Sequence, residues 1–316
     1  MSVPKILVVG GNGFLGSAIC KAAVGKGWEV SSMSSSGKPY KTLKGHTPSW
    51  VEKVNWKKGN AFEPETYKNL IKEKESIIHT LGILLENSNY KQSLKKGNLF
   101  ELFSNVLLSN EKEKNNPLLS LKNEKNENQL GYEGINKNSA LKVLDTFLSE
   151  PFSLNLNQPK QKQFIYISAA DAFKPLIPSK YIETKREAEF EIIRKCELYN
   201  NKESLNKGNI KPILIRPGLM YHPHIRPLTT LPAFLIDISS KLSLKLGGKN
   251  PFASNSFFYG TLESFKTFPL HVDHVALSIL KSIEDSRQGI IDKNNLGQAR
   301  IIEVSEMREL AGLGKS

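Results

Sequence analysis

Cysteine is scarce in this sequence, and its scarcity argues against a fold built on disulfides. Cys20 and Cys196 are the two cysteines among 316 residues, and both fall in stretches with helical spacing far apart in the chain. Small secreted folds that depend on disulfides carry many closely spaced cysteines. We therefore expect free thiols and a reducing compartment.

Long apolar runs are also lacking. No stretch approaches the roughly 18 consecutive apolar residues that a membrane-spanning helix needs. The first strand-like run begins almost at Met1, so no cleavable presequence is visible before it. Peripheral contact is therefore the form of membrane association that the sequence leaves open.

Acidic residues are outnumbered by basic ones, 31 Asp and Glu against 44 Lys and Arg, which gives a formal net charge of +13. A nucleic-acid-binding protein usually gathers its basic residues in a stripe with interleaved aromatic side chains. The lysines here are scattered along the chain, so we expect no nucleic-acid partner. The charge instead favours attraction to anionic lipid or phosphorylated ligands.

Strand-like and helical patterns alternate along the chain. Runs of β-branched and aliphatic residues are typical of strands that are buried on both faces of a parallel sheet. The expected strands are Lys5–Val9, Trp28–Met33, Ser76–His79, Phe164–Ile167 and Pro212–Ile215, and the expected helices include Thr66–Glu73, Ile135–Leu148 and Tyr181–Tyr199. This alternation predicts an α/β fold, a Rossmann-type doubly wound parallel sheet with a small C-terminal substrate-binding part.

A glycine-rich loop follows the first expected strand and opens a helix. Gly10, Gly13 and Gly16 stand in the string GGNGFLG. Such glycines let the backbone approach a pyrophosphate, while the helix N-terminus supplies N–H donors and the positive end of the helix dipole. The strand, the spacing and the helix together predict a dinucleotide site, with helix packing alone as the alternative. The other loop residues assigned to this site are Asn12, Phe14 and Leu15.

The end of the second expected strand carries no acidic residue. An Asp or Glu at this place binds the ribose hydroxyls in sites that prefer NAD. This chain has instead Ser34, Ser35, Ser36 and Lys38, which can hydrogen-bond or ion-pair with a 2′-phosphate. We therefore expect NADP(H) to be favoured over NAD(H), with Lys38 as a merely solvated loop charge the alternative.

Two further strand ends are assigned to the cofactor site. Leu81 and Gly82 follow the strand Ser76–His79, and Pro217 and Gly218 follow the strand Pro212–Ile215. A backbone turn after the latter strand can line a nicotinamide pocket.

A serine, a tyrosine and a lysine form a candidate catalytic set. Tyr181 and Lys185 make Y-x-x-x-K, which puts both side chains on one helix face, and Ser168 ends an expected strand thirteen residues earlier. In this chemistry the tyrosine exchanges a proton with the substrate oxygen while hydride moves on the nicotinamide, and a nearby ammonium lowers the tyrosine pKa. Ser168 would hold the substrate oxygen, and Asn136 would support a proton relay. Each residue alone is ordinary; their order favours catalysis.

No metal is expected. His271 and His274 flank Asp273, but no further ligand stands at metal spacing, so these residues fit a loop or a helix cap better than a zinc site.

We divide the chain at residue 218. Residues 1–218 are expected to form the NAD(P)-binding domain, and 219–316 a smaller substrate-binding part of which 263–285 packs back on that domain. An insertion at about 88–130 is expected to be mobile, because Asn110–Asn128 is rich in Asn, Lys and Glu. The apolar stretch Leu228–Leu244 fits an interfacial or pocket-capping helix or, as we favour, an ordinary core helix.

Several of these strings resemble one known family. GGNGFLG, SIIHTLG, YISA, YIETKREAE, IRPG and PLHVDHVA are similar to the extended or atypical short-chain dehydrogenase/reductases related to the NADPH-binding accessory subunit of NADH-ubiquinone oxidoreductase. Gly82–Leu94 and Pro175–Glu189 also resemble the fungal mitochondrial coenzyme Q biosynthesis proteins of this family. The resemblance implies a matrix-side protein at the mitochondrial inner membrane, with the coenzyme Q biosynthetic complex as partner and a polyprenylated, lipid-tailed quinone precursor as substrate.

Three functions remain open from the sequence. The first is an NADP(H)-dependent oxidoreductase that uses Ser168, Tyr181 and Lys185. The second is a non-catalytic, nucleotide-binding scaffold subunit of the biosynthetic complex. The third is a nucleotide-sugar epimerase or reductase, because the same fold serves many reactions.

Overall fold

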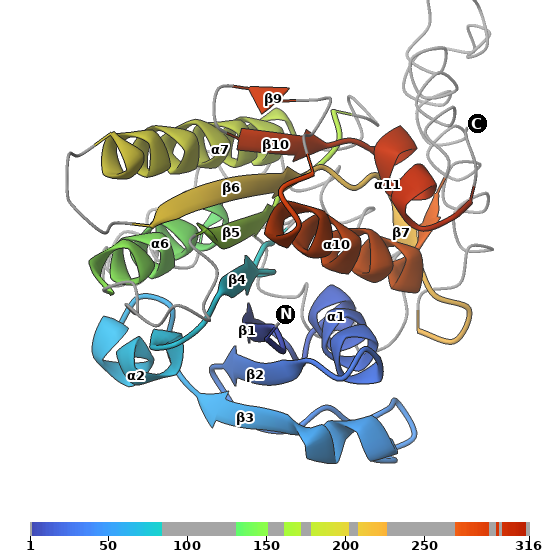
Figure 1. Ribbon diagram of the computed structural model, residues 1–316. Coiled ribbons are helices and arrows are strands. Elements are labelled where there is room, and N and C mark those ends of the chain that lie inside the picture. Colours follow the sequence, from blue (N-terminus) through green and yellow to red (C-terminus); the bar gives the residue numbers. More distant parts are fainter. Residues whose placement is uncertain are drawn as a thin grey trace, which may run out of the picture.

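The computed structural model describes residues 2–83, 131–150, 161–171, 178–201, 208–225, 269–290, 295–296 and 299–313. In this part of the chain, eight strands form one sheet in the order β3-β2-β1-β4-β5-β6-β10-β9. Neighbouring strands are parallel except for β9, which runs antiparallel to β10. This arrangement confirms the Rossmann-type α/β class that the sequence predicts (Figure 1).

The central strands are the apolar runs of the sequence. The strands of the sheet are β1 (Lys5–Val9), β2 (Glu29–Ser34), β3 (Val54–Lys58), β4 (Ser76–His79), β5 (Gln161–Ile167), β6 (Asn209–Ile215), β9 (Asn295–Leu296) and β10 (Ala299–Ile302). All four residues of β4 are buried, as are the last six of β5. Burial on both faces explains why the apolar residues of these strands are consecutive, as in Ile77–Ile78 and Phe164–Ile167, rather than alternating.

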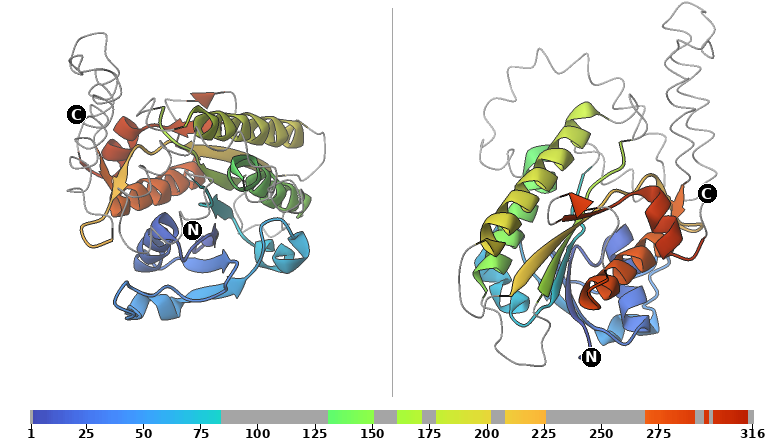
Figure 2. Two further views of the ribbon diagram at one scale, coloured as in Figure 1. Left: turned by 180° about the vertical axis from the view of Figure 1, so that it is seen from behind. Right: turned by 45° about the horizontal axis from the view of Figure 1, so that its top comes forward.

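Helices cover both faces of the sheet (Figures 1 and 2). One layer contains α1 (Phe14–Gly25), α10 (Val272–Arg287), α11 (Val304–Leu310) and the 3₁₀ turn η1 (Ser49–Lys53); the other contains α2 (Lys68–Ile71), α6 (Ser139–Ser149), α7 (Ser179–Asn200), the π-helical segment η5 (Glu133–Asn138) and the 3₁₀ turn η2 (Pro64–Thr66). Alternate residues of β1 enter different cores: Ile6 and Val8 pack under α1 and α10, and Leu7 and Val9 pack under α6 and α7.

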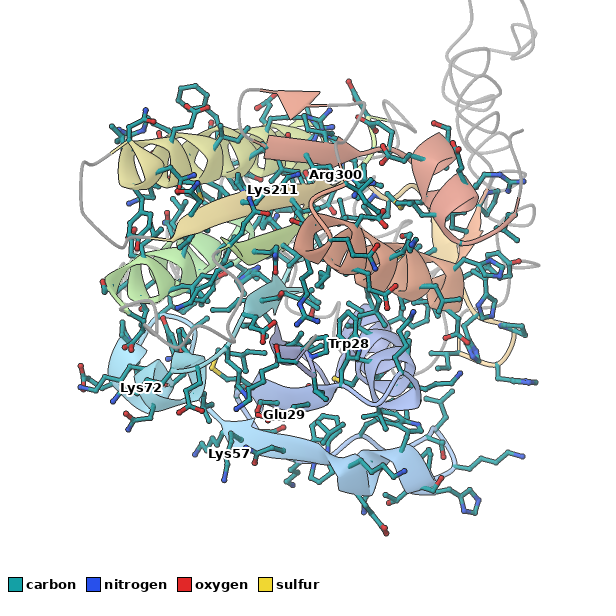
Figure 3. The ribbon with its side chains drawn as sticks, in the orientation of Figure 1. Trp28, Glu29, Lys57, Lys72, Lys211 and Arg300 are labelled. Atoms are coloured by element: carbon teal, nitrogen blue, oxygen red, sulfur yellow. The ribbon has the colours of Figure 1, made fainter. Side chains whose placement is uncertain are left out.

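The described C-terminal residues join this sheet. β10 pairs in parallel with β6, and α10 packs along α1. Arg300 on β10 lies against α10 in Figure 3, where its guanidinium reaches Asp285 at 3.5 Å and Glu306 of α11 at 2.8 Å. A separate two-stranded pair, β7 (Met220–Tyr221) and β8 (Leu270–His271), leads into α10. The division at residue 218 stays a prediction.

The structure differs from the sequence patterns in several places, including β3, β10 and two helices. β3 is not predicted, because this edge strand ends in Lys57 and Lys58; β10 is not predicted, because it has four residues and one is Arg300. The helix expected over 135–148 begins as the π-helical η5 before α6, and Asn136 within η5 is buried and bonds to Ile83 in the loop after β4. The helix expected over 66–73 is reduced to η2 and the single turn α2.

Within the described ranges, no helix has the length and apolarity needed to cross a membrane. The expected mobile insertion at Asn110–Asn128 and the apolar stretch Leu228–Leu244 lie outside the described residues.

His79, at the end of β4, is an ionisable side chain held in the core. Its ring is fully buried and stacks near Tyr166, with ring centroids 6.0 Å apart. The Ser139 hydroxyl donates to the Ile135 carbonyl at 2.7 Å, so the ring Nε2–H donates to Ser139 Oγ at 3.1 Å. Burial, helped by the charge of Lys185, lowers the pKa of His79 to about 3.

We predict that His79 makes the protein less stable in mild acid. Its pKa is lowered in the folded state, so the unfolded chain binds one more proton below about pH 6.5. Between pH 6.5 and pH 5.0 this linkage costs about 2 kcal/mol of unfolding free energy. Urea titrations at several pH values measure the effect.

His79→Phe should lose that part of the pH dependence, while His46→Asn, which changes an exposed histidine, should keep it. An unchanged slope in His79→Phe would show that His79 does not titrate as its burial implies.

Candidate functional site

The candidate site lies at the carboxyl ends of the parallel strands. The sheet order changes direction between β1 and β4, which is where open α/β sheets bind their ligands. The segments that leave this edge are Gly10–Gly13, Ser34–Lys38, Thr80–Ile83, Ser168–Asp171 and Arg216–Gly218. All the expected site residues except those on η5 and α7 and in the first turn of α1 lie in these segments.

The glycine loop brings α1 into contact with the end of β1. Gly10 has φ +89°, and the Gly13 N–H donates to the Gly10 carbonyl at 2.9 Å. A Cβ on Gly16 would lie 2.2 Å from the Gly10 oxygen, so no side chain fits at this position. Glycine is therefore required for both the turn and the helix packing, and the dinucleotide site that the sequence assigns to this loop stays a prediction.

The N-terminus of α1 is suited to a phosphate. Gly13 is the N-cap and offers no side-chain bond, and the first turn contains no acidic residue. The open N–H groups and helix dipole favour an anion at this end. Leu15 is buried and Phe14 is partly buried against the core. Their backbone N–H groups, rather than their side chains, are therefore the groups that would contact a phosphate. These features fit a dinucleotide pyrophosphate.

The turn after β2 is rich in serine, and hydrogen bonds hold its conformation. Ser36 Oγ accepts from Asn12 Nδ2 at 3.2 Å and from the Lys38 N–H at 3.3 Å, and the Gly37 N–H donates to Ser34 Oγ at 3.1 Å. Asn12 thereby connects the glycine loop to the β2 turn. Ser35 and Lys38 are exposed beside it.

A second basic position, which the sequence analysis missed, adjoins this turn. A Cβ on Gly37 would lie 2.7 Å from the Cβ of Lys58, so the Lys58 backbone packs against the turn. Lys57 extends outward from the edge strand β3 in Figure 3. Both lysines are exposed, and the pairing of β2 with β3 is what brings them here.

The loop after β4 forms a wall of the site. The Thr80 hydroxyl donates to the Val9 carbonyl at 2.7 Å, and a Cβ on Gly10 would lie 2.9 Å from Leu81 Cδ2. A Cβ on Gly82 would lie 3.1 Å from Lys185 Nζ and 3.3 Å from Asn136 Oδ1. The glycine at 82 thus leaves room for two expected catalytic residues to meet the loop.

Asn136 fastens that wall in place. Its Oδ1 accepts from the Ile83 N–H at 2.9 Å, and its Nδ2 donates to the Ile83 carbonyl at 3.2 Å. Its backbone carbonyl accepts a hydrogen bond from the Tyr166 hydroxyl. With its amide engaged in this way, Asn136 positions the loop; its role in a proton relay stays a prediction.

Lys185 is buried at the centre of the site. Its Nζ donates to the Ile167 carbonyl at 2.8 Å and lies 4.8 Å from the ring centroid of Tyr166 and 6.0 Å from that of Tyr181. Burial lowers the pKa of Lys185 to about 7, against the attraction of Glu189.

Tyr181 lies in the first turn of α7, one turn before Lys185. Its ring meets Tyr132 edge-on, with centroids 6.2 Å apart. Because Y-x-x-x-K lies within the regular helix α7, Tyr181 and Lys185 are on the same helix face, as the sequence spacing predicts.

Ser168 follows β5 and is 3% exposed. Its N–H donates to the Ile215 carbonyl at 2.7 Å, and its Oγ accepts from Arg186 Nη1 at 3.0 Å. The sequence analysis missed Arg186, although it directly follows Lys185. Pro217 accepts from the Ala170 N–H at 2.9 Å, which places the turn after β6 beside this serine.

His271 has a structural role. His271 caps α10, with its Nδ1 accepting from the Asp273 N–H at 3.2 Å. Among the residues that the structure describes, no three His, Cys, Asp or Glu side chains are arranged to hold a metal ion.

The sheet, the glycine loop and the bare α1 N-terminus define a Rossmann-type NAD(P)-binding protein. Residues 6–99 match the model of the NAD dependent epimerase/dehydratase family. The protein called MIOREX complex component 2 in Saccharomyces cerevisiae is 38% identical over 225 residues, which are 70% of this chain and 74% of the yeast protein. The chain belongs to the NAD-dependent epimerase/dehydratase family.

Two further likenesses have a narrower meaning. The chloroplastic protein At1g32220 of Arabidopsis thaliana is 48% identical over 78 residues, 25% of this chain and 24% of that protein. A carbonyl reductase from Pseudomonas aeruginosa superposes with a TM-score of 0.51 at 10% identity, over 96% of this chain and 97% of the reductase. The second likeness concerns the fold alone.

The expected identification with the coenzyme Q biosynthesis proteins, and with the relatives of the respiratory accessory subunit, is wrong. The curated relative that matches most of the chain is a MIOREX complex component, so the coenzyme Q complex and its quinone precursors are withdrawn as partner and substrate. The error has a physical reason. The glycine string and Y-x-x-x-K are shared by many proteins of one fold with different roles, so they do not distinguish its members, and Gly82–Leu94, which contains neither motif, is too short a string to do so.

We predict that Lys185→Met stabilises the protein. At pH 7.5 a buried lysine whose pKa is lowered costs folding free energy, because the unfolded chain binds the proton more tightly. Methionine fills a similar volume without a charge, and the expected gain is about 1–3 kcal/mol. Thermal and urea unfolding measure it.

Lys180→Met, an exposed change on the same helix, is the control and should alter stability by less than about 0.5 kcal/mol. A less stable Lys185→Met protein would mean that the Ile167 hydrogen bond outweighs the cost of burial.

Proposed function

We propose that this protein is an NADP(H)-dependent oxidoreductase that interconverts a carbonyl and a hydroxyl group, with Ser168, Tyr181 and Lys185 as its catalytic residues. The observation that carries the proposal is the buried Lys185 ammonium beside the Tyr181 ring, at the wall formed by Gly82. A charge buried at a cost, with a pKa near 7 and next to a proton donor, is typical of a catalytic site.

Each side chain has a distinct task in this reaction. A bound nicotinamide would supply or accept the hydride. The Tyr181 hydroxyl gives its proton to the substrate oxygen during reduction, and the Lys185 ammonium stabilises the tyrosinate that remains. The Ser168 hydroxyl donates a hydrogen bond to the same oxygen. Asn136 holds the Gly82–Ile83 wall.

The choice of NADP(H) rests on the turn after β2. Ser34–Lys38 contains no carboxylate that would repel a 2′-phosphate, and its hydroxyls are already ordered by Asn12 and Gly37. Lys38 in the turn and Lys58 beside Gly37 add exposed positive charge. A phosphate gains charge-assisted hydrogen bonds from such groups.

A second function is a nucleotide-binding member of a multi-protein assembly that performs no chemistry. The name of the yeast relative, which calls it a complex component, favours this alternative. A mitochondrial location, expected from the sequence resemblance, forms part of this proposal. The two functions differ in one respect that can be measured: the alternative needs the glycine loop but has no use for the Tyr181 hydroxyl.

We predict that the protein binds NADPH about tenfold more tightly than NADH, the worth of one good ion pair or hydrogen bond. Gly13→Val should abolish binding of both, because its side chain would stand at the α1 N-terminus near the Gly10 oxygen. Gly25→Ala is the matched control at the other end of α1, where a Cβ meets nothing within 4 Å. Calorimetric titration measures all three proteins, and equal affinity for NADH would refute the NADP preference.

We predict that Tyr181→Phe lowers the turnover of a carbonyl probe such as 4-nitrobenzaldehyde at least ~100-fold, because general acid catalysis contributes about that much or more. The ring is kept, so NADPH affinity and melting temperature should not change. NADPH oxidation followed at 340 nm measures turnover. Wild-type rates in Tyr181→Phe would exclude the oxidoreductase, and NADPH binding without turnover in either protein would favour the assembly member.

A further inference from the structure

The hydroxyl oxygen of Ser168 accepts a hydrogen bond from a guanidinium group. Arg186 Nη1 donates to Ser168 Oγ at 3.0 Å, and Arg186 Nη2 donates to the neighbouring Ala169 carbonyl at 2.8 Å. In the described part of the chain, Arg186 is the side chain that contacts this hydroxyl. The serine is 3% exposed, so solvent does not compete for the bond.

A buried carboxylate holds Arg186 in this position. Glu189 Oε1 accepts from Arg186 Nη1 at 2.6 Å, and Arg216 binds the same carboxylate through two nitrogens, at 2.9 and 2.5 Å. Arg216 also reaches Glu303, before α11, at 2.8 Å. This chain of ion pairs connects the ends of β5, β6 and β10 to α7. Because such charge-assisted bonds are short and directional, the guanidinium of Arg186 is fixed relative to the serine.

We propose that Arg186 is a positioning residue that turns the Ser168 hydroxyl into a dedicated hydrogen-bond donor for the substrate oxygen. A hydroxyl has one hydrogen and two lone pairs. Because Arg186 donates to one lone pair of Ser168 Oγ, the hydroxyl hydrogen is directed away from Arg186, and the nearby positive charge strengthens its donation to a substrate oxygen that becomes negative. A fixed donor stabilises such charge far better than one that must reorient. This inference rests on the proposed function.

The proposal predicts that Arg186 acts only through Ser168. Arg186→Met should lower kcat on 4-nitrobenzaldehyde about 10- to 100-fold, somewhat less than the loss of a whole oxyanion donor, with the NADPH dissociation constant unchanged. Ser168→Ala should cost at least as much. The double variant should be no slower than Ser168→Ala, because the arginine has nothing left to position. Independent, multiplying effects would overturn the proposal.

Two more variants separate positioning from folding. Arg186→Lys keeps the charge but not the two-nitrogen geometry and should recover part of kcat. Arg194→Met removes an exposed arginine of the same helix that pairs with Glu191 at 2.7 Å, and it should leave kcat and melting temperature unchanged. Glu189 keeps its bonds to Arg216 in Arg186→Met, so that variant should fold. A loss in Arg194→Met equal to that in Arg186→Met would overturn the proposal.

A binding measurement tests the positioning role of Arg186 independently of turnover. The affinity of 4-nitrobenzoate, a carboxylate that imitates a negative substrate oxygen, is measured with NADP⁺ present in the same four proteins of the cycle. If the losses of 4-nitrobenzoate affinity are non-additive but the wild-type protein shows no turnover, the positioning role of Arg186 is supported and the oxidoreductase function is rejected. If the changes in 4-nitrobenzoate affinity are additive or absent while the wild-type protein turns over the aldehyde, the positioning role of Arg186 is rejected and the oxidoreductase function is retained. A wild-type protein that neither binds the anion nor turns over would overturn both.

Discussion

The close approach of α1 to the end of β1 is the constraint on which the rest of the molecule depends. A Cβ on Gly16 would collide with the Gly10 carbonyl, so this contact exists only between glycines. It seats α1 on the sheet, and α10 then packs on α1. The same contact directs the bare helix N-terminus toward the carboxyl edge of the strands. Core packing and anion binding are thus consequences of one steric requirement.

Charged side chains are buried at this edge of the sheet: Lys185 and Glu189 fully, and Arg186 in part. Lys185, Arg186 and Glu189 lie within two turns of α7, and their partners come from the ends of β5 and β6. Strand ends supply carbonyl groups that the sheet does not use, which compensates part of the desolvation cost. The side chains that catalysis would require are therefore concentrated where the fold can best accommodate them.

Much of this arrangement was predictable from the sequence because it depends on local pattern. The runs Lys5–Val9 and Ser76–His79 are strands with the expected bounds, and the Y-x-x-x-K spacing puts Tyr181 and Lys185 on one helix face. β3 and β10 were not predictable, since their identity as strands depends on the neighbours with which they pair. Family motifs also misled us on identity, because shared chemistry preserves them in proteins with different roles.

The sequence by itself determined the sheet-forming runs, the glycine loop and the helical spacing of the candidate catalytic pair, because these follow from periodicity and from the steric needs of single residues. Only the tertiary structure decided that Asn136 clamps Ile83, that Lys58 adjoins the β2 turn and that Arg186 reaches Ser168 while Glu189 joins it to Arg216. These contacts join residues from different strands and helices. Their existence depends on how parallel strands align at one edge of the sheet, and the one-dimensional pattern carries no record of that alignment.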